Sequence, residues 1–598
     1  MNYRYGLLAA ATALSLPAAA QERIDSVLVT ANRTPTTASE TLASVDVITR
    51  EDIEERQPLD VPDLLGGLAG VDISRNGGRG NTTSVNIRGT SNGQTLVLVD
   101  GVRVGSATTG AAALGNLAPE QIERIEVVRG PRASLYGADA IGGVIQIFTR
   151  RNEGASASVT AGGNNTRAVN AGYGRRSEQG FWSLNAARFL TDGFDVVDDN
   201  GEPDDDGFRQ TSLSFRGARE LTDSARVDAA VQYREGEPRF DGNPDGSSNK
   251  QHSTRLGLEF TPIDAWDLSI DLTRAFDDSD GRAFGGGRFT TDRYGVTLQN
   301  DFYLGAEQVL TVGGAIRHTE VGGTTDFNED ERDNVGVFGQ YQWRPGAWDL
   351  ELALRHDDNE AFGTATTGSA AAGYQFTDDV RGFVSFGTAF KAPGFNDLFF
   401  PGFGNPDLEP ERSRSWEATL TGSGAIDWRF TAFRTEIDDL IGFDSATFTA
   451  ENVDNATIEG VETRLATTVA GFRTRLNATL QDPENERTGN TLRRRAKVLA
   501  NLAVSRQVGA FRYGADARFR GERYDDAANR DELGSFATVD LRASWEIAPQ
   551  WRLRGVVRNA FDRDYATART SGFTAGDEYN SEGRVALITL SWNQDSQE

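Results

Sequence analysis

The chain from residue 153 onward alternates apolar and polar residues with a period of two. In the segments 266–273, 348–355 and 551–558, a Trp is followed by apolar residues at every second position, and mostly polar residues fill the positions between them. This alternation predicts β-strands with one apolar and one polar face. Two architectures satisfy it: a soluble sandwich whose polar face meets water, and a transmembrane barrel whose apolar face meets lipid.

Three features favour the barrel. Strand signals recur about every 20 residues as far as the C-terminus. Tight turns at 344–347 and 547–550 alternate with longer polar loops, and Trp266, Trp348 and Trp545 lie at strand ends, as aromatic residues do at a membrane interface. The spacing predicts an all-β transmembrane barrel of roughly 22 antiparallel strands in this C-terminal domain, 153–598. The lumen of so wide a barrel must be plugged.

Residues 33–152 follow a different pattern, which predicts a small α/β plug domain in the lumen. The expected elements are strands at 45–49, 87–89 and 96–102, a helix at 49–57, and a helix that opens at Pro62 and stops at the glycines at 66, 67 or 70.

The stretch 123–147 closes this domain. It predicts a strand around Ile125, one helical turn at 133–136 ended by Gly137, and a second strand at 144–148. Its glycines indicate tight turns. A phosphate-binding loop is the alternative, but no Lys-Ser or Lys-Thr follows the glycines.

The N-terminus has the pattern of a targeting segment. Residues 1–20 combine a basic start, an apolar run and an Ala-Ala-Ala cleavage site, which predicts a signal peptide and export. The segment 21–32 follows, with the β-prone run 25–31, which has no sheet of its own. This run is either a disordered tail or a strand that adds to a partner's sheet.

Composition and motifs argue against several classes of function. The net charge of −27 argues against nucleic acid as a partner, and the chain has no cysteine for disulfides or thiolate metal sites. Its three histidines, His252, His318 and His356, lie far apart in sequence. No apolar run after residue 20 is long enough for a membrane-spanning helix. No G-x-S-x-G motif or acid–base set indicates an enzyme.

An acidic loop precedes Gly207. Eight of the fifteen residues from 192 to 206 are Asp or Glu. Carboxylates at this density repel one another unless hard cations collect them, and oxygen ligands with Asp-x-Asp spacing suit Ca²⁺. The alternative is a solvated loop, or one that divalent cations bridge to lipopolysaccharide.

Several motifs resemble the plug domain of TonB-dependent outer-membrane transporters. They are D-L-L…G-V-D-I, I-R-G, V-L-V-D-G-V and R-G-P…Y-G…A-I-G-G-V-I, in the family's order. The resemblance implies a monomer in contact with outer-membrane lipids that imports a nutrient and performs no catalysis. It also implies that the energy-transducing protein TonB binds a TonB box. The implied box residues are Asp25, Ser26, Val27, Leu28, Val29, Thr30 and Ala31.

Within this family, the runs L-R-R-R-A-K at 492–497 and N-A-F-D-R-D-Y at 559–565 resemble the cobalamin transporters. The resemblance implies cobalamin as cargo and extracellular loops ordered by Ca²⁺, with a ferric siderophore or another bulky nutrient as the alternative cargo. A passive porin is disfavoured, because a diffusion pore needs neither plug nor TonB box. The implied calcium residues are Asp195, Glu202, Asp204, Asp206, Phe240, Asp241 and Asp245. The implied cargo contacts are Ser84, Ser91, Asn92, Thr109, Gly110, Thr290, Arg494 and Ala528.

Overall fold

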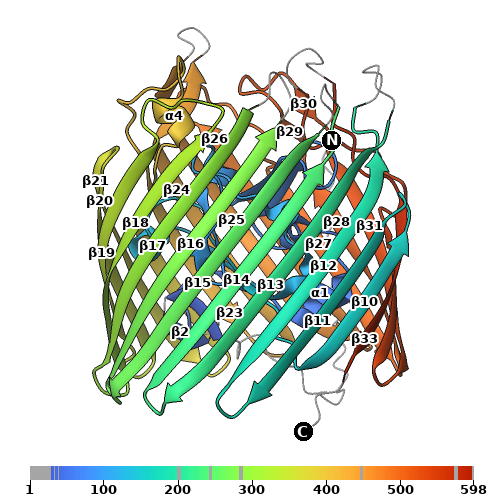
Figure 1. The fold of residues 1–598 in the computed structure, drawn as a ribbon, viewed down its shortest axis with the longest axis horizontal. Helices are drawn as coiled ribbons and strands as arrows, with labels where there is room; N and C mark the ends of the chain where they lie inside the picture. Colours follow the sequence, from blue (N-terminus) through green and yellow to red (C-terminus); the bar gives the residue numbers. More distant parts are fainter. Residues whose placement is uncertain are drawn as a thin grey trace, which may run out of the picture.

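The computed structural model describes residues 28–32, 34–37, 40–197, 204–241, 246–281, 287–444, 449–570 and 577–594. Twenty-two strands of the described chain close into an antiparallel barrel (Figure 1). The closure pairs β10 (Gly154–Gly162) with β33 (Val585–Asn593). The predicted number of strands is confirmed.

The other barrel strands follow one another around the ring in chain order. They are β11 (Arg167–Ser177), β12 (Gly180–Phe194), β13 (Asp206–Thr222), β14 (Ala225–Pro238), β15 (Ser247–Ile263), β16 (Trp266–Gly281), β17 (Gly287–Tyr303), β18 (Gln308–Gly323), β19 (Glu331–Trp343), β20 (Trp348–Asn359), β21 (Gly363–Thr377), β22 (Val380–Lys391), β23 (Glu411–Gly422), β24 (Ile426–Asp444), β25 (Thr449–Val469), β26 (Phe472–Asn485), β27 (Val498–Val508), β28 (Phe511–Arg520), β31 (Phe536–Ala548) and β32 (Trp551–Arg558).

The apolar face of the barrel points outward. On β20, Leu352 and Leu354 are 58% and 62% exposed, whereas Arg355 and Asp357, which alternate with them, are 1% exposed. This arrangement is the reverse of a water-soluble sandwich and suits a strand between lipid and a polar lumen. It excludes the soluble alternative.

The two rims of the barrel differ. One rim carries short turns such as 178–179, 223–224 and 509–510. The other carries longer loops, which hold α4 (Phe395–Phe399) and a hairpin of β29 (Arg523–Tyr524) with β30 (Glu532–Leu533) (Figure 1). Outer-membrane barrels have short periplasmic turns and longer extracellular loops, which identifies the loop-bearing rim as extracellular.

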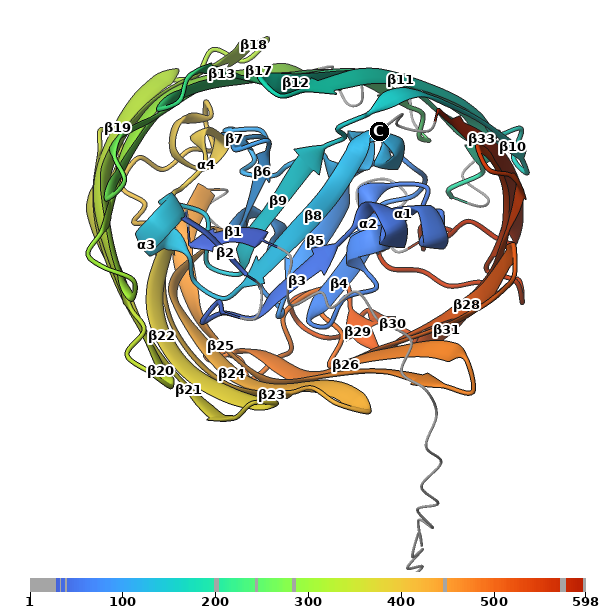
Figure 2. The ribbon, with the colours of Figure 1, turned by 90° about the horizontal axis from the view of Figure 1, so that it is seen from below.

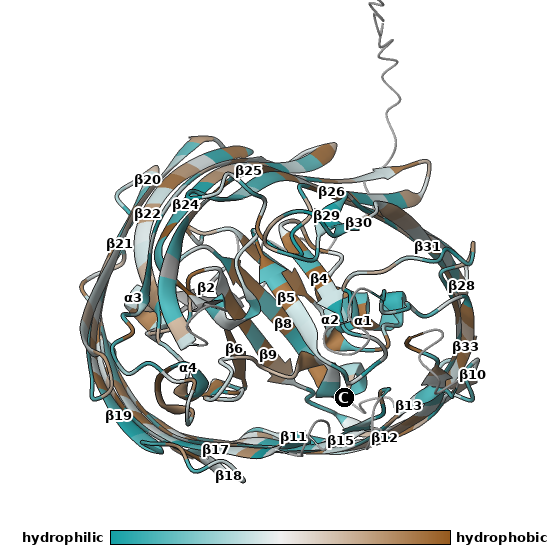
Figure 3. Ribbon diagram, turned by 90° about the horizontal axis from the view of Figure 1, so that it is seen from above, coloured by the Kyte–Doolittle hydropathy of each residue, from teal (hydrophilic) through white to brown (hydrophobic). Residues whose placement is uncertain are grey.

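A separate domain fills the ring (Figures 2 and 3). Its five-stranded sheet has the order β3-β8-β9-β6-β7, with β6 parallel to β9, and β4 pairs with β5 beside it. The elements of this plug are β3 (Val45–Ile48), α1 (Arg50–Arg56), α2 (Val61–Leu65), β4 (Val71–Arg75), β5 (Thr83–Ile87), β6 (Thr95–Val99), β7 (Val102–Arg103), β8 (Ile122–Arg129), α3 (Ala133–Tyr136) and β9 (Gly143–Thr149).

Local sequence explains the ends of the plug helices. Thr49 caps α1 in a reciprocal capping box with Asp52, and the side chain of Asp60 caps α2 by accepting a hydrogen bond from Asp63 N. Gly137 ends α3 at φ +82°, as its lack of a Cβ atom led us to expect.

Two expected strands are wrong in part. The segment 87–89 is a turn beyond Ile87, because Arg88 and Gly89 adopt φ of +49° and +73°. The segment 96–102 is a hairpin and not one strand, because φ is positive at both Asp100 and Gly101. An Asp-Gly pair favours this two-residue turn between strands.

The N-terminal run also differs from expectation. Leu28–Asn32 forms β1 and pairs with β2 (Thr34–Thr37), so the run has a strand partner within its own chain. Both strands lie inside the ring (Figure 2). Asp25, Ser26 and Val27 lie outside the described residues. Separately, no helix among the described residues combines the length and apolarity needed to cross a bilayer.

Candidate functional site

The plug has its own hydrophobic core. The largest cluster of buried apolar side chains runs from Ile48 to Ile147 and belongs to the plug alone. The barrel strands turn polar side chains toward it. Plug and barrel meet through many polar and charged groups, and also through an apolar cluster in which Ile141 of the plug packs with Phe390 and Phe433 of the barrel.

The centre of this interface is a buried ion cluster. Arg88, in the turn after β5, donates to Glu462 on β25 at 2.9 Å with both Nε and Nη2, and to Glu417 on β23 at 2.7 Å with Nη1. All three side chains are less than 10% exposed. Buried charges of this kind are tolerated only when paired, so the cluster fixes where the plug sits in the barrel.

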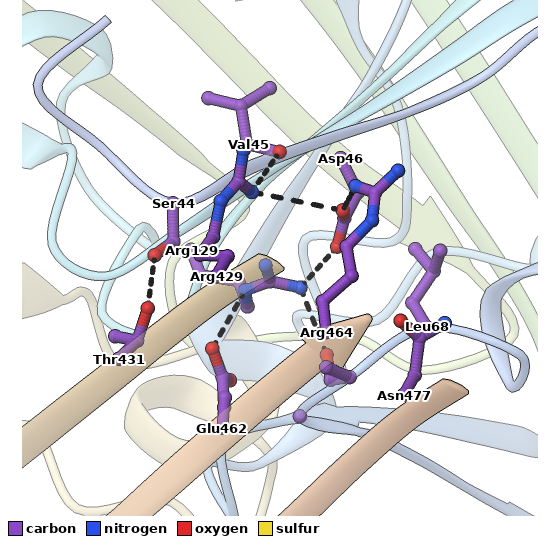
Figure 4. Close-up of polar contacts among 12 residues, drawn as sticks. Ser44, Val45, Asp46, Leu68, Arg129, Arg429, Thr431, Glu462, Arg464 and Asn477 are labelled. Carbon is purple, nitrogen blue, oxygen red and sulfur yellow. Dashed lines mark hydrogen bonds and ion pairs between the residues drawn. The ribbon is translucent and has the colours of Figure 1, made fainter. Parts of the chain in front are cut away.

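Asp46 on β3 forms the second half of the cluster (Figure 4). Its carboxylate contacts Arg129 of the plug and Arg464 of β25, each at 2.5 Å, and Arg429 of β24 at 3.9 Å. Burial alone would raise the pKa of Asp46, but these three guanidinium groups together hold it well below its usual range.

Helix α1 extends the ionic contact toward the periplasmic rim. Glu55 accepts from Arg542 at 2.9 Å, Glu54 accepts from Arg552 at 2.9 Å, and Asp52 lies 3.3 Å from Arg475. The pairs of Glu54 and Asp52 are partly exposed to solvent, whereas the side chains of Arg542 and Glu55 are 6% and 11% exposed. Exposed ion pairs contribute little to stability, so the pair of Arg542 and Glu55 matters most of the three.

Three of the residues expected to bind calcium converge at the extracellular rim. One carboxylate oxygen each from Asp195, Asp206 and Asp241 lie within 4.8 Å of one another. Ligand oxygens on opposite sides of one Ca²⁺ are about 4.6–5.2 Å apart, so the spacing fits a shared ion. Asp204 lies two residues before Asp206, and Phe240 directly precedes Asp241. Glu202 and Asp245 lie outside the described residues.

The loop that bears Asp195 packs on the plug. Val196 is 1% exposed and packs against Gly77, where an added Cβ would lie 3.1 Å from the Val196 side chain. Val196 N donates to Asp206 Oδ2 at 3.0 Å, and Asn580 N donates to Val196 O at 2.9 Å. The predicted metal residues are thus coupled to the plug surface.

Arg494 connects several extracellular segments. It adopts φ +59°, forms an ion pair with Asp525, and donates to Asn76 Oδ1 of the plug at 3.0 Å and to Arg569 O at 3.2 Å. A non-glycine residue held at positive φ by such contacts is often functional. Ala528 lies in the same loop as Asp525. This loop is hydrogen-bonded to the Arg494 loop, because Asn529 contacts the backbone of Thr491.

The other expected cargo contacts fall into separate places. Ser91 and Asn92 open a short turn whose Gly93 lies beside Gly110, and Thr109 is exposed next to it. Ser84 lies on β5 opposite Ser74, apart from this group in the sheet.

Thr290 is not brought to this group. Its neighbour Thr291 is buried and accepts a hydrogen bond from Ala107 N of the plug at 3.0 Å. Strand alternation places Thr290 on the opposite face of β17, which it shares with the exposed Tyr294 and Val296.

Sequence analysis missed the ion cluster. Arg88 and Arg129 lie inside the I-R-G and R-G-P motifs, which were interpreted as a short strand and as a turn, with no role assigned to either arginine. The available signal was that each arginine directly follows apolar residues of a strand, where a buried charge needs a partner.

A closed barrel with polar inner walls, filled by a plug held by ion pairs, defines a plugged outer-membrane transporter. The family model "TonB dependent receptor-like, beta-barrel" matches residues 129–560, and "TonB-dependent Receptor Plug Domain" matches residues 37–144. The chain belongs to the TonB-dependent receptor family and is an outer-membrane β-barrel transporter.

Curated relatives match over nearly the whole chain. The vitamin B12 transporter BtuB of Photobacterium profundum is 34% identical over 616 residues, covering 98% of this chain and 99% of the relative. The BtuB of Vibrio vulnificus is 32% identical over 602 residues, covering 95% of each chain.

Solved structures share the fold. A mutant of the ferric enterobactin receptor PfeA of Pseudomonas aeruginosa superposes with a TM-score of 0.79 at 18% identity, covering 93% of this chain and all of that one. The ferric yersiniabactin uptake receptor FyuA of Yersinia pestis gives 0.79 at 17% identity, covering 93% and 99%. At these identities the likeness concerns the fold alone.

Proposed function

We propose that this transporter imports cobalamin. The observation that carries the proposal is the full-length similarity to two vitamin B12 transporters, at 34% and 32% identity. The loops over the plug support it, because Arg494 and the Asp195 loop both contact the plug surface on which a cargo would rest. Ferric siderophores are the alternative cargo.

Calcium orders the binding loops in this proposal. Asp195 and Asp206 lie where β12 and β13 are connected, and Asp241 lies where β14 and β15 are connected, so one ion would join the two connections. Neutralising the three clustered charges would let the loops close over the cargo.

TonB couples energy through the segment Asp25–Ala31. Strand addition to TonB needs free backbone donors and acceptors, but β1 already pairs with β2. Binding of TonB therefore requires β1 to exchange its partner within the chain for a strand of TonB. Cargo contacts that favour the released form would bias this exchange.

The test is uptake of radiolabelled cobalamin by cells that lack their own transporter. We expect expression of this chain to restore uptake, and Arg494→Ala to reduce it more than the exposed outer-face variant Arg414→Ala. Restored uptake of ferric siderophores without any uptake of cobalamin would transfer the proposal to the alternative cargo.

A further inference from the structure

A cavity lies between the plug and the barrel wall, beside Thr109 and Gly110. It has a volume of about 50 Å³ and is lined by the segment 103–110 of the plug, by inward-facing residues of β17, β18 and β19, and by the loop that holds α4. Its size suits a few water molecules or one small oxyanion, not a bulky nutrient.

Basic side chains dominate the lining. The cavity is lined by Arg103, Arg293, Arg317, Arg332 and Lys391, against the two carboxylates Asp139 and Asp397. Lys391 forms its ion pair with Glu411 at 3.2 Å, outside the cavity. Within the lining, four guanidinium groups face two carboxylates. Two further carboxylates lie beyond it: Asp357, which is paired with Arg355 at 2.7 Å, and Asp277, which accepts from Gln251 at 2.7 Å. Guanidinium groups remain charged in proteins.

The existing contacts do not absorb this charge. Arg103 pairs with Asp139 at 3.3 Å, whereas Arg293 donates to Gly105 O at 3.3 Å and Arg332 to Pro393 O at 2.8 Å, both of which are neutral carbonyls. The backbone of Arg317 is paired in the sheet, but its side chain has no hydrogen bond or ion pair with the residues that the structure describes, and Asp357 attracts it from beyond the lining.

The fold closes this cavity from the extracellular side. Phe395 N of α4 donates to Ala107 O at 3.0 Å, and Asn396 N donates to Thr108 O at 3.3 Å. Phe395 is fully buried, and Arg332 lies 4.8 Å from its ring centre. The segment that holds α4 therefore covers the cationic side chains of the cavity. Their mutual repulsion is strong there and poorly screened.

We propose that this cavity is an oxyanion site, which binds a phosphate or a phosphate-like group through Arg317 and its neighbours. Guanidinium groups present paired donors that match the oxygens of phosphate, and an anion removes the excess charge that water alone leaves uncompensated. The excess of guanidinium groups over carboxylates in the lining favours an anion over a cation.

Two sources could supply the oxyanion. One is the phosphodiester that cobalamin carries, and this source rests on the proposed cargo. The other is inorganic phosphate bound independently of any cargo, which would hold the plug to the barrel wall. Both use the same chemistry at Arg317, and the experiment separates them.

The test uses the purified full-length protein in detergent and phosphate-free buffer. Isothermal titration with inorganic phosphate at constant ionic strength should show saturable binding. Arg317→Gln should weaken it by about tenfold or more, because it removes a charged donor. Arg317→Lys should keep part of the affinity, and Arg288→Gln, which removes an outer-face arginine paired with Asp278, should leave it unchanged.

Cobalamin titrations with and without phosphate identify the source. Competition would show that the cargo phosphodiester uses the site, and independent binding would show that a free anion occupies it. If cobalamin does not bind, only the proposed cargo is contradicted, because the phosphate titration does not depend on cobalamin. Absence of saturable phosphate binding, or equal binding by Arg317→Gln, would overturn the oxyanion site.

Discussion

Arg88 of the plug and Glu462 of the barrel form a bidentate ion pair, with both nitrogen–oxygen distances at 2.9 Å. The two residues lie 374 positions apart in the sequence, and both are 4% exposed. The pair is parallel, charge-assisted and shielded from water, which makes it a strong contact between the two domains.

Glu462→Gln should loosen the plug. The change leaves Arg88 with one carboxylate, Glu417, and removes a counter-charge from Arg129 as well, which lies 3.4 Å from Glu462. Breaking one partner of a buried pair costs about 3–5 kcal/mol. Thermal unfolding in detergent and the uptake of a large antibiotic by cells should both report the loss. Arg414→Ala, in an exposed outer-face pair with Asp438, is the control, and equal effects of the two variants would contradict the assignment.

Leu28→Pro should abolish uptake while leaving cargo binding intact. Proline removes the backbone donor that strand addition to TonB requires, and β2, with which Leu28 pairs, lies in the half of the barrel away from the extracellular loops (Figure 1). Uptake of labelled cargo by energised cells and binding to isolated outer membranes are measured side by side. Leu28→Ala keeps the backbone donor and should transport. Normal uptake by the proline variant would exclude this run as the TonB contact.

Removing two of the converging carboxylates should remove the calcium site. The variant Asp206→Ala with Asp241→Ala leaves Asp195 as the one ligand of the three, so calcium titration should show no saturable binding, and calcium should no longer raise the unfolding temperature. Asp326→Ala, at an exposed position in another extracellular loop, is the control. If a chelator leaves cargo binding by the unmodified protein unchanged, calcium has no part in binding.

Acid should loosen helix α1. Burial alone would raise the pKa of Asp52, but Arg475, Arg56 and hydrogen bonds from Thr49 lower it to about 2, from 3.8. A lowered pKa means that the stabilisation, roughly 2 kcal/mol, is complete above the unfolded value and is lost as the pH falls from about 4 to about 2. Pepsin, which acts in this range, should cut the plug increasingly as the pH falls.

Asp52→Asn provides the comparison for this pH effect. It removes the titrating group, so plug cleavage should start at a higher level and depend less on pH between 4 and 2. The same steepness in both proteins would assign the acid sensitivity to other carboxylates.

Much of the fold follows from local sequence. The alternation at 348–355 predicted both the strand and its outward apolar face, and Thr49 and Gly137 marked helix ends that the structure confirms. The errors lie at 87–89 and 96–102, where apolar runs hid positive-φ turns at Arg88 and Asp100. Hydrophobicity predicted burial there, but the local preference of Asp-Gly for a turn prevailed.

The candidate site was less predictable. The density of acidic residues around 195 and 206 predicted a cation site, and the resemblance to the family added Asp241 to it. The basic cavity gave no such signal, because Arg103, Arg293, Arg317 and Arg332 lie on four separate elements, each among ordinary polar neighbours. Thr290 was expected to contact cargo from its place in the sequence, and only the structure shows that it lies on the face of β17 away from the plug.

The sequence by itself determined the strands, their two faces and the division into plug and barrel, because these depend on a period of two and on turn residues that act within a few positions. Only the tertiary structure decided which charges meet. Asp46 and Arg464 are 418 positions apart, and their contact depends on the register of every strand between them and on how the plug is turned in the ring. A shift of one residue in a strand would turn its inward charges to lipid, so the ion pairs and the basic cavity exist only once the barrel has closed around the plug.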